Sequence, residues 1–559
     1  MQFPFLPGRD VSCHKLTGFA GLDRTAAAQL SGFSQMENLC AEHYPAASPR
    51  QPRTRVLEGL TQALSTANGL CYVRGGTVYL AGSPVLSGLS AGEKQLIGMG
   101  AKLIILPDKK WLNTVDLSHG NLEAFAEATN VSLSLVDAHG KPYDVSFSAT
   151  APQNPEKGAL WLTETDLLQF DGEDFLPLPT YVRLGVSGVG FAAGDVVQIA
   201  GIALPGSSCL NGSQRLCRVA DSYMDIEGFC LPATQPEGLG KITVSRQMPK
   251  LDMVFECGNR LWGCRYGVDN LGQIVNEIYA SRLADATNWQ DFSGTAADSW
   301  RVSLGSQGAF TGAIAYLGQP LFFKEGSLHR IYGSYPAQYG VDSVDCRGVQ
   351  QGSEGSLAVV DEILYYVSCA GVCRYDGSLP VLVSQKLGDW HLERGVGGSF
   401  RGKYYLSCET QEEKHLLVYT PRLGLWHREN SLDCLSFASD ANRLYCRCAS
   451  GIWVLGQGSE SVSWSACTPP LTLEGFHATR FQKLMFLLRL PLGSRMEIRV
   501  SYDEQKPVLL GALEGKQDPL RKVIFRPRRC QQFQLLLSGQ GDMELKELGI
   551  YTGKGGAVT

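Results

Sequence analysis

Histidines and carboxylates, the side chains that most often move protons or bind metals, are scattered along this chain. Nine histidines occur in 559 residues, and they form no metal-ligand spacing with Cys, Asp or Glu. The chain contains no zinc-protease H-E-x-x-H, no Walker phosphate loop and no EF-hand loop. We therefore expect hydrogen-bonded or solvated histidines, among them His391, His415, His427 and His477.

Two acidic pairs and one glycine-rich stretch come nearest to a reactive site. Asp361–Glu362 and Glu412–Glu413 fall at expected hairpin turns, and no spacing supports a glycosidase that works through two carboxylates. The stretch GVSGVGFAAG, from Gly185, has a superficial likeness to a phosphate loop, but it lies among expected strands with no helix after it. These patterns predict that the chain is not an enzyme and has no catalytic residue, metal site or cofactor.

Cysteines are also dispersed, which indicates packing rather than reactivity. The chain has seventeen of them, spread over expected strands instead of forming a disulfide framework. The close pairs are Cys369–Cys373 and Cys446–Cys448, and neither has the C-x-x-C spacing of a zinc or redox site. We predict that most cysteines are small buried apolar residues or strand-face positions.

Basic residues form two clusters. The first consists of Arg50, Arg53 and Arg55, and the second of Arg521, Lys522, Arg526, Arg528 and Arg529. The favoured interpretation is a solvated strand face or a rim of salt bridges to a neighbouring subunit, and the alternative is a surface touched by an acidic partner or by passing DNA. A net charge of -5 and a pI near 6.0 give no global reason to expect a nucleic-acid partner. A DNA channel should also bind weakly, because each neutralised phosphate adds affinity.

Aromatic residues recur at a regular distance. Tyr332, Tyr375 and Tyr419 are 43 and 44 residues apart, and recurrence at one period is what packing between repeated units requires. The alternative is that some aromatics are exposed platforms for sugar rings, with Trp289, Trp390, Trp426 and Trp453 as candidates.

The elements that must position these residues are short β-runs that repeat about every forty residues. The first turns of four copies are 44, 40 and 40 residues apart, at Gly318, Glu362, Gly402 and Asn442. Such a period is typical of a β-propeller, in which each repeat is one four-stranded blade. Hairpins at Gly75–Gly76 and Gly258–Asn259 add two further blades.

We therefore predict an all-β chain: a six-bladed β-propeller with an inserted small β-barrel or sandwich domain and a C-terminal β-sandwich. The expected divisions are 1–68 for an extended N-terminal segment that closes the ring, 69–117 for blade 1, 118–246 for the inserted domain, 247–468 for blades 2 to 6 and 469–559 for the sandwich. No window approaches the roughly 18–20 consecutive apolar residues of a membrane-spanning helix. The first residues also do not form a secretory signal, so we expect a protein that is made and kept soluble in a cytoplasm, or exported only as part of something larger.

Several phrases of the sequence resemble one family of proteins. They are NLCAEHYPAASPR (Asn38–Arg50), EIYASRLADATNWQDF (Glu277–Phe292), PLFFKEGSLHRIYG (Pro320–Gly333) and SGQGDMELKELGIY (Ser538–Tyr551). In this order they resemble the β-propeller tail proteins of tailed bacteriophages, in particular the head-tail stabilisation and tail-nozzle proteins of short-tailed phages. The resemblance implies a homohexameric ring in the virion tail, assembled in the bacterial host cytoplasm, around the channel through which double-stranded DNA leaves. Its partners would be neighbouring tail adaptor, portal or fibre proteins.

Two functions follow from these expectations, and a propeller enzyme such as a glycosidase or lyase is a third, less favoured alternative. The first is a structural tail component that acts through protein–protein interfaces. The alternative is a carbohydrate-binding propeller or tail-tip adhesin that recognises the host surface. They differ in where the aromatic residues lie, because core residues must be buried whereas a sugar site needs a few exposed rings at one location.

Overall fold

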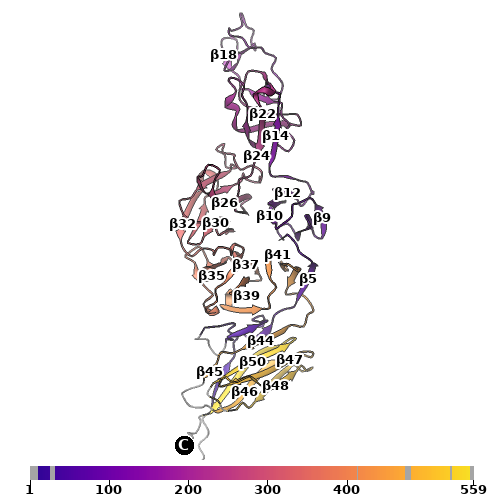
Figure 1. The fold of residues 1–559 in the computed structure, drawn as a ribbon, viewed down its shortest axis with the longest axis vertical. Coiled ribbons are helices and arrows are strands. Elements are labelled where there is room, and N and C mark those ends of the chain that lie inside the picture. The colour runs from indigo at the N-terminus through magenta and orange to yellow at the C-terminus, as the bar shows by residue number, and fades with distance from the viewer. Residues whose placement is uncertain are drawn as a thin grey trace, which may run out of the picture.

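The computed structural model describes residues 11–25, 32–411, 413–472, 480–528, 530 and 532–553. Strands dominate these residues, which confirms the all-β prediction. A ring of sheets lies in the middle of an elongated molecule, with one β-module at each end of the long axis (Figure 1). No helix found in the described part of the chain has the length and apolar character needed to cross a membrane.

Seven four-stranded antiparallel sheets form the ring within the described residues, and each is one blade. Blade 1 consists of β6 (Ala63–Ser65), β7 (Cys71–Arg74), β8 (Thr77–Leu80) and β9 (Ser83–Leu86), and blade 2 of β10 (Gln95–Met99), β11 (Lys102–Leu106), β12 (Lys110–Asn113) and β13 (His119–Asn121). Blade 3 consists of β25 (Met253–Cys257), β26 (Arg260–Val268), β27 (Ile274–Ala280) and β28 (Trp300–Ser303), and blade 4 of β29 (Gly312–Tyr316), β30 (Gln319–Lys324), β31 (Ser327–Tyr332) and β32 (Gly340–Asp345). Blade 5 consists of β33 (Ala358–Val360), β34 (Ile363–Ser368), β35 (Gly371–Tyr375) and β36 (Val381–Leu382), and blade 6 of β37 (Glu393–Phe400), β38 (Lys403–Glu409), β39 (Lys414–Thr420) and β40 (Leu425–Glu429). Blade 7 combines β41 (Cys434–Ser439), β42 (Leu444–Cys448) and β43 (Gly451–Leu455) with β5 (Arg53–Glu58).

The ring is closed by a strand from the other end of the chain. β5 pairs antiparallel with β43, and Arg53 lies opposite Leu455. The first strands of most successive blades contact one another, β29 of blade 4 contacts the turn at Glu354–Ser356 that precedes β33, and β41 of the last blade contacts β6 of the first. Because β5 covers β43, the third strand of blade 7 has no free edge.

The prediction of six blades is wrong. The hairpin at Gly75–Gly76 belongs to blade 1, whereas the strands between 95 and 113 belong to a separate blade 2. β6 and β10 begin 32 residues apart, which is shorter than the spacing of the regular copies, and β6 and β9 are only 3 and 4 residues long. Strands this short carry little periodic signal. Blade 1 therefore starts at Ala63 rather than at residue 69.

The segment between β13 and β25 forms a module of its own, between blades 2 and 3. Eight of its strands hydrogen-bond in the order β14-β24-β20-β21-β22-β19-β15-β23, and β16, β17 and β18 form a three-stranded sheet. Their bounds are β14 (Ala124–Ala128), β15 (Val131–Val136), β16 (Leu160–Leu162), β17 (Leu167–Phe170), β18 (Phe175–Pro177), β19 (Tyr181–Leu184), β20 (Val196–Ala200), β21 (Gly212–Ala220), β22 (Tyr223–Glu227), β23 (Ala233–Gln235) and β24 (Ile242–Arg246). Buried side chains such as Leu133, Ile226 and Val244 give this module a separate hydrophobic core.

The C-terminal module contains two sheets that include strands from both ends of the chain. One has the order β1-β51-β46-β49, and the other β2-β44-β50-β47-β48 with β45 beside β50. The bounds are β1 (Val11–Leu16), β2 (Gln35–Glu37), β44 (Ser463–Cys467), β45 (Leu471–Thr472), β46 (Arg480–Arg489), β47 (Arg495–Tyr502), β48 (Val508–Glu514), β49 (Leu520–Phe525), β50 (Gln532–Gln540) and β51 (Glu544–Gly553). The N-terminal segment therefore does more than close the ring, and residues 463–467 belong to this module rather than to the last blade.

The C-terminal module also shares its core with the ring. One cluster of buried residues includes Phe486 and Leu537 of the module, Leu22 of the N-terminal segment, and Tyr365 and Trp426 of blades 5 and 6. A short hairpin, β3 (Leu39–Cys40) with β4 (Ser48–Pro49), lies at this junction. Within the described residues the helical elements are short 3-10 turns: η1 (Ser208–Leu210), η2 (Glu237–Leu239), η3 (Pro336–Gln338), η4 (Glu354–Ser356), η5 (Gln385–Leu387) and η6 (Pro421–Leu423).

Candidate ligand-binding cleft

A cleft of about 980 Å³ opens where the N-terminal segment crosses blade 6. Its lining comes from Leu22, Arg24 and residues 34–37 of the N-terminal segment, and from residues 389–391, 410–411, 413–415 and 428–431 of blade 6 and the loops beside it. The polar side chains of its lining include Arg24, Gln35, Glu37, His391, Gln411, Arg428 and Asn430. The volume lies at the upper end of the roughly 300–1,000 Å³ typical of small-molecule sites.

Trp390 lines this cleft and is half-buried by two stacked neighbours. The imidazole of His415 stacks on its indole with ring centroids 4.4 Å apart, and the guanidinium of Arg24 lies over the ring at 4.2 Å. Burial lowers the pKa of His415, and the charge of Arg428 adds to this effect. Arg24 is held loosely by comparison, since its ion pair with the exposed Asp389 measures 3.8 Å. A ligand must therefore use the remaining surface of Trp390 or displace Arg24.

Three exposed polar side chains in the cleft have no hydrogen-bond partner among the residues that the structure describes. Gln35, His391 and Gln411 form no side-chain hydrogen bond to any other described residue. A glutamine amide offers both donors and an acceptor, and a neutral imidazole offers one of each. The cleft thus presents unpaired donors and acceptors beside an aromatic ring, which suits a ligand rich in hydroxyl groups.

Most charged side chains in the cleft have an oppositely charged partner. Arg428 lies 3.2 Å from Glu37 Oε2 and 3.9 Å from Glu413 Oε2. Behind it, the buried Glu429 accepts a hydrogen bond of 2.6 Å from Arg53. Burial alone would raise the pKa of Glu429, but the hydrogen bond with His427 and the charge of Arg53 outweigh burial and hold that pKa far below its usual range. This balance favours a neutral ligand over a strongly charged one.

The other candidate aromatic residues serve mainly as packing residues. Trp289 and Trp426 are buried, and their Nε1 atoms donate 2.9 Å hydrogen bonds to the carbonyl oxygens of Ala286 and Val383. Trp453 is half-buried and donates to Ser450 Oγ at 3.2 Å. Of the recurring tyrosines, Tyr375 and Tyr419 are buried, whereas Tyr332 is 50% exposed. The packing prediction is therefore wrong for Tyr332, which lies at the end of β31.

The N-terminal basic cluster is tied to its own chain. Arg50 is buried and forms an ion pair with Glu460 at 2.7 Å and a hydrogen bond with Asn38 at 3.0 Å. Arg53 pairs with Glu429, and the more exposed Arg55 pairs with Glu58. These arginines do not form an open basic surface, because the guanidinium groups of Arg50 and Arg53 form ion pairs and hydrogen bonds within the chain.

The C-terminal basic cluster is more exposed. Lys522, Arg526 and Arg528 are exposed, and Arg528 donates a 3.0 Å hydrogen bond to Gln505. Arg521 donates to the carbonyl oxygen of Glu514. Arg529 lies outside the described residues, as do two other residues weighed above, Glu412 and His477.

Three sequence features that resembled reactive sites occupy ordinary β-turn or loop positions. Asp361 and Glu362 form the turn between β33 and β34. The glycine-rich stretch from Gly185 connects β19 to β20, so no helix N-terminus follows it. A G-x-S-x-G stretch at Gly88–Gly92, which sequence reasoning missed, lies between β9 and β10 rather than between a strand and a helix. Its Ser90 accepts a 2.6 Å hydrogen bond from Lys94, which also forms a 2.7 Å ion pair with Asp108.

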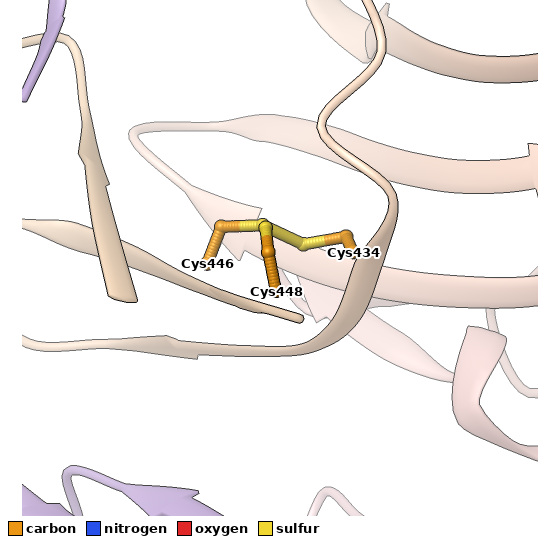
Figure 2. Close-up of side chains that lie close together, drawn as sticks. All are labelled: Cys434, Cys446 and Cys448. Carbon is orange, nitrogen blue, oxygen red and sulfur yellow. A yellow bond between two sulfur atoms is a disulfide. The ribbon is translucent and has the colours of Figure 1, made fainter. Parts of the chain in front are cut away.

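The cysteine prediction is wrong in blade 7. Cys446 forms a disulfide with Cys434, with Cα atoms 6.0 Å apart, and the Sγ atom of Cys448 lies 3.4 Å from that of Cys446 (Figure 2). The C-x-C pair was visible in the sequence, but its partner twelve residues earlier carried no signal. In blade 5, Cys373 is buried as expected and Cys369 is exposed.

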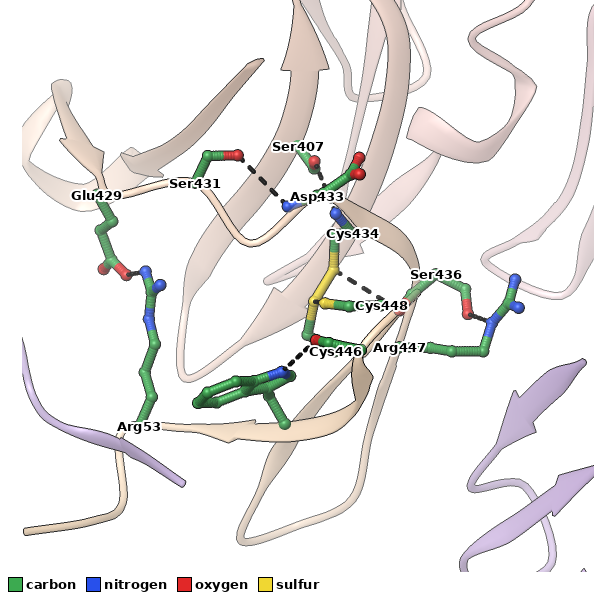
Figure 3. The surroundings of a disulfide bond; sticks show 12 residues. Arg53, Ser407, Glu429, Ser431, Asp433, Cys434, Ser436, Cys446, Arg447 and Cys448 are labelled. Carbon is green, nitrogen blue, oxygen red and sulfur yellow. Dashed lines mark hydrogen bonds and ion pairs between the residues drawn. A yellow bond between two sulfur atoms is a disulfide. The ribbon is translucent and has the colours of Figure 1, made fainter. Parts of the chain in front are cut away.

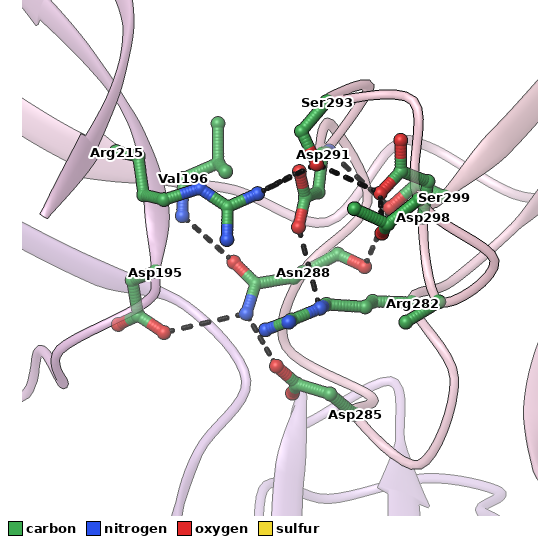
Figure 4. Close-up of polar contacts among 12 residues, drawn as sticks. Asp195, Val196, Arg215, Arg282, Asp285, Asn288, Asp291, Ser293, Asp298 and Ser299 are labelled. Carbon is green, nitrogen blue, oxygen red and sulfur yellow. Dashed lines mark hydrogen bonds and ion pairs between the residues drawn. The ribbon is translucent and has the colours of Figure 1, made fainter.

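A buried polar network fastens the inserted module to blade 3 (Figure 4). The side-chain oxygen of Asn288 accepts a 2.9 Å hydrogen bond from the backbone N–H of Val196, and its amide nitrogen donates to Asp195 at 3.4 Å. Arg215 of the module forms an ion pair with the buried Asp291, which Arg282 also approaches to 3.3 Å. Several polar residues of the phrase EIYASRLADATNWQDF therefore hold this junction together.

Comparison with known proteins gives no family. No protein-family model and no curated protein matches the chain. Among solved structures, an exo-β-1,3-galactanase from Phanerochaete chrysosporium with galactose has 9% identity and a TM-score of 0.20, over 53% of this chain and 94% of that one. An arabinoxylan arabinofuranohydrolase of glycoside hydrolase family 43 from Bacillus subtilis, in complex with cellotetraose, has 10% identity and a TM-score of 0.14, over 54% and 95%. The extracellular domain of a putative hybrid two-component system from B. thetaiotaomicron has 9% identity and a TM-score of 0.16, over 93% and 96%.

These matches correct one prediction. Several of the similar structures are glycoside hydrolases, so the prediction that the chain is not an enzyme is contradicted and we withdraw it. At TM-scores between 0.14 and 0.21 the same matches assign neither an activity nor a substrate to this chain.

Proposed function

We propose that this protein is a carbohydrate-binding propeller whose ligand lies in the cleft between the N-terminal segment and blade 6. The observation that carries this proposal is the set of unpaired Gln35, His391 and Gln411 side chains around Trp390 in a cleft of about 980 Å³. Sugar hydroxyls need donors and acceptors in fixed positions, and the apolar face of a sugar ring packs on aromatic carbon. The paired charges of Arg428, Glu37 and Glu413 favour a neutral oligosaccharide.

A glycan array followed by titration of its strongest ligand tests this proposal. We expect saturable binding, and Gln411→Ala should weaken it by about 2- to 10-fold through the loss of one or two hydrogen bonds. The matched control is Gln273→Ala, since Gln273 is equally exposed but lies on the β26–β27 hairpin outside the cleft. Equal affinity in both variants, or no binding by the parent, would refute the cleft as a sugar site.

We also propose that the protein is a component of a phage tail, where a carbohydrate-binding propeller would act as a tail-tip adhesin. The resemblance of several phrases to phage tail proteins motivates this proposal, as does an elongated body with modules at opposite ends that are available to different neighbours (Figure 1). In this role the chain assembles into a ring, six-fold as in the family it resembles, around the path of the DNA. Mass photometry of the purified protein, with electron micrographs of the particle that carries it, should show a closed ring. A monomer in both samples would contradict this second proposal and leave the first intact.

A further inference from the structure

Three cysteines of blade 7 meet at one buried point. The Sγ atoms of Cys434, Cys446 and Cys448 all lie within 4.8 Å of one another, and each residue is at most 6% exposed. We infer that, once the Cys434–Cys446 disulfide is reduced, these thiols bind a thiophilic d¹⁰ metal ion, Zn²⁺ or Cu⁺. Soft thiolate ligands select such ions.

The strand geometry explains why the three side chains converge. Cys446 and Cys448 are two residues apart on β42 and therefore point to the same face. Cys434 lies opposite Cys448 on the neighbouring β41, next to a β-bulge between Cys434 and Ser436. A bulge redirects the side chains beside it, which allows Cys434 to join the pair on β42.

The compact shape of the cluster suits a metal better than thiol–disulfide exchange. In-line attack by Cys448 on Cys446 would place the attacking and leaving sulfurs about 5.4 Å apart, the 3.4 Å approach plus a bond of about 2.04 Å. The Cys434 and Cys448 sulfurs are within 4.8 Å, so they are not in line. By contrast, Zn–S bonds of about 2.3 Å put the sulfurs of one tetrahedral site about 3.8 Å apart. Small shifts of the three cysteine side chains would bring their Sγ atoms to that spacing.

Two arginines lie near the cluster, and each already pairs with a carboxylate, Arg53 with Glu429 and Arg447 with Glu93. The buried guanidinium groups of Arg53 and Arg447 lie in the surroundings of the cluster (Figure 3), and Arg447 is fixed by Ser436 Oγ at 2.9 Å. Apolar side chains that include Phe437 and Trp453 pack around the sulfurs and limit the access of water. Three thiolates fill a trigonal Cu⁺ site and leave one position of a Zn²⁺ site for water.

The chemistry balances with a small thiol as the reductant. Two thiol molecules form one external disulfide and give two electrons and two protons to the Cys434–Cys446 bond, which yields two protein thiols. Binding of the metal then releases the protons of the three coordinating thiols. The cytoplasm supplies thiol reductants of this class.

Metal binding by the full-length protein tests the inference. Protein reduced with excess thiol, freed of the reductant without air, should bind about one Cd²⁺ per chain with an ultraviolet sulfur-to-metal charge-transfer band. Parallel titrations with Zn²⁺ and Cu⁺ identify the preferred ion. Cys448→Ser should weaken binding by more than the roughly 10- to 100-fold that follows loss of an outer-shell partner. The matched control is Cys373→Ser, because Cys373 is also buried on a strand but lies in blade 5.

The oxidised parent protein is a second control, since its sequence is unchanged and its disulfide occupies two of the three sulfurs. The oxidised parent should bind the metal at least about tenfold more weakly than the reduced parent. This comparison remains valid even if Cys448→Ser fails to fold. Equal metal binding by the reduced and oxidised parents, or none by the reduced parent, would overturn the inference.

Discussion

Several charged side chains of this protein are buried between blades. Arg53 comes from the strand that closes the ring, and Glu429 ends the last strand of blade 6, so their 2.6 Å ion pair links two blades. Lys324 and His329 are likewise buried in blade 4, where Lys324 Nζ donates a 3.0 Å hydrogen bond to Asn276 of blade 3. Removing one partner of such a pair leaves the other in a medium that solvates it poorly.

Glu429→Gln is therefore expected to destabilise the ring. It leaves Arg53 without a counter-charge, at an expected loss of about 3–5 kcal/mol in the free energy of unfolding. The control is Glu409→Gln, which removes solvent-accessible ion pairs with Arg394 and Lys414 and should cost at most about 1 kcal/mol. Urea denaturation of both variants measures the loss in the free energy of unfolding. Equal losses would show that burial does not strengthen the contribution of the Arg53–Glu429 pair.

His329 should make the protein sensitive to mild acid. Burial, with a smaller effect of the Lys324 charge, lowers the pKa of His329 to about 4. In the unfolded chain the pKa of a histidine is near 6.5. Between that pH and the lower native pKa, His329 is therefore protonated in the unfolded chain but neutral in the native protein. The free energy of unfolding should consequently fall as pH drops from about 6.5 to about 4, by on the order of 3 kcal/mol. His329→Gln should flatten this fall in urea titrations, whereas the exposed control His139→Gln should not. The same pH slope in His329→Gln and the parent would contradict the account.

At the scale of elements, the sequence was informative where turns and strands repeat locally. The turns at Gly318, Gly402 and Asn442 do connect the first and second strands of their blades. The expected blade 69–117 combined blades 1 and 2, because β6 and β9 are too short to show a period. The joining of β1 and β2 to the C-terminal module was missed for another reason, since their partners lie more than four hundred residues away in the chain.

The candidate cleft was only partly predictable for the same physical reason. Trp390 was considered as a sugar platform, but Gln35 and Gln411 come from distant segments that tertiary folding brings together. A lone exposed glutamine carries no local pattern. The apolar spacing that identifies a strand reports burial, whereas a binding site consists of the residues that are not buried.

The junction between the inserted module and blade 3 depends on Asn288, so Asn288→Ala should loosen it. This substitution leaves the N–H of Val196 and the carboxylate of Asp195 short of a partner, at an expected cost of about 1–3 kcal/mol. Limited proteolysis should then cut the connections near residues 122 and 248 faster, with the ring still protected. Gln198→Ala is the control, because its hydrogen bond to Gln290 crosses the same junction in an exposed position. Unchanged cleavage in Asn288→Ala would show that other contacts hold the module.

At the scale of the whole molecule, the ring and the C-terminal module behave as one body because they share a core around Trp426 and Phe486. The cleft lies at this junction, where the N-terminal segment passes from the C-terminal module to blade 6. Its walls are therefore held by parts of the chain that fold together. A preformed site of this kind binds without a large ordering cost.

The most direct test of the central claim is an experimental structure of the protein bound to the strongest ligand from a glycan array. The account predicts sugar density in the cleft, in contact with Trp390 and within hydrogen-bond distance of Gln411 and His391. Density at any other surface, or an empty cleft at saturating ligand, would contradict it.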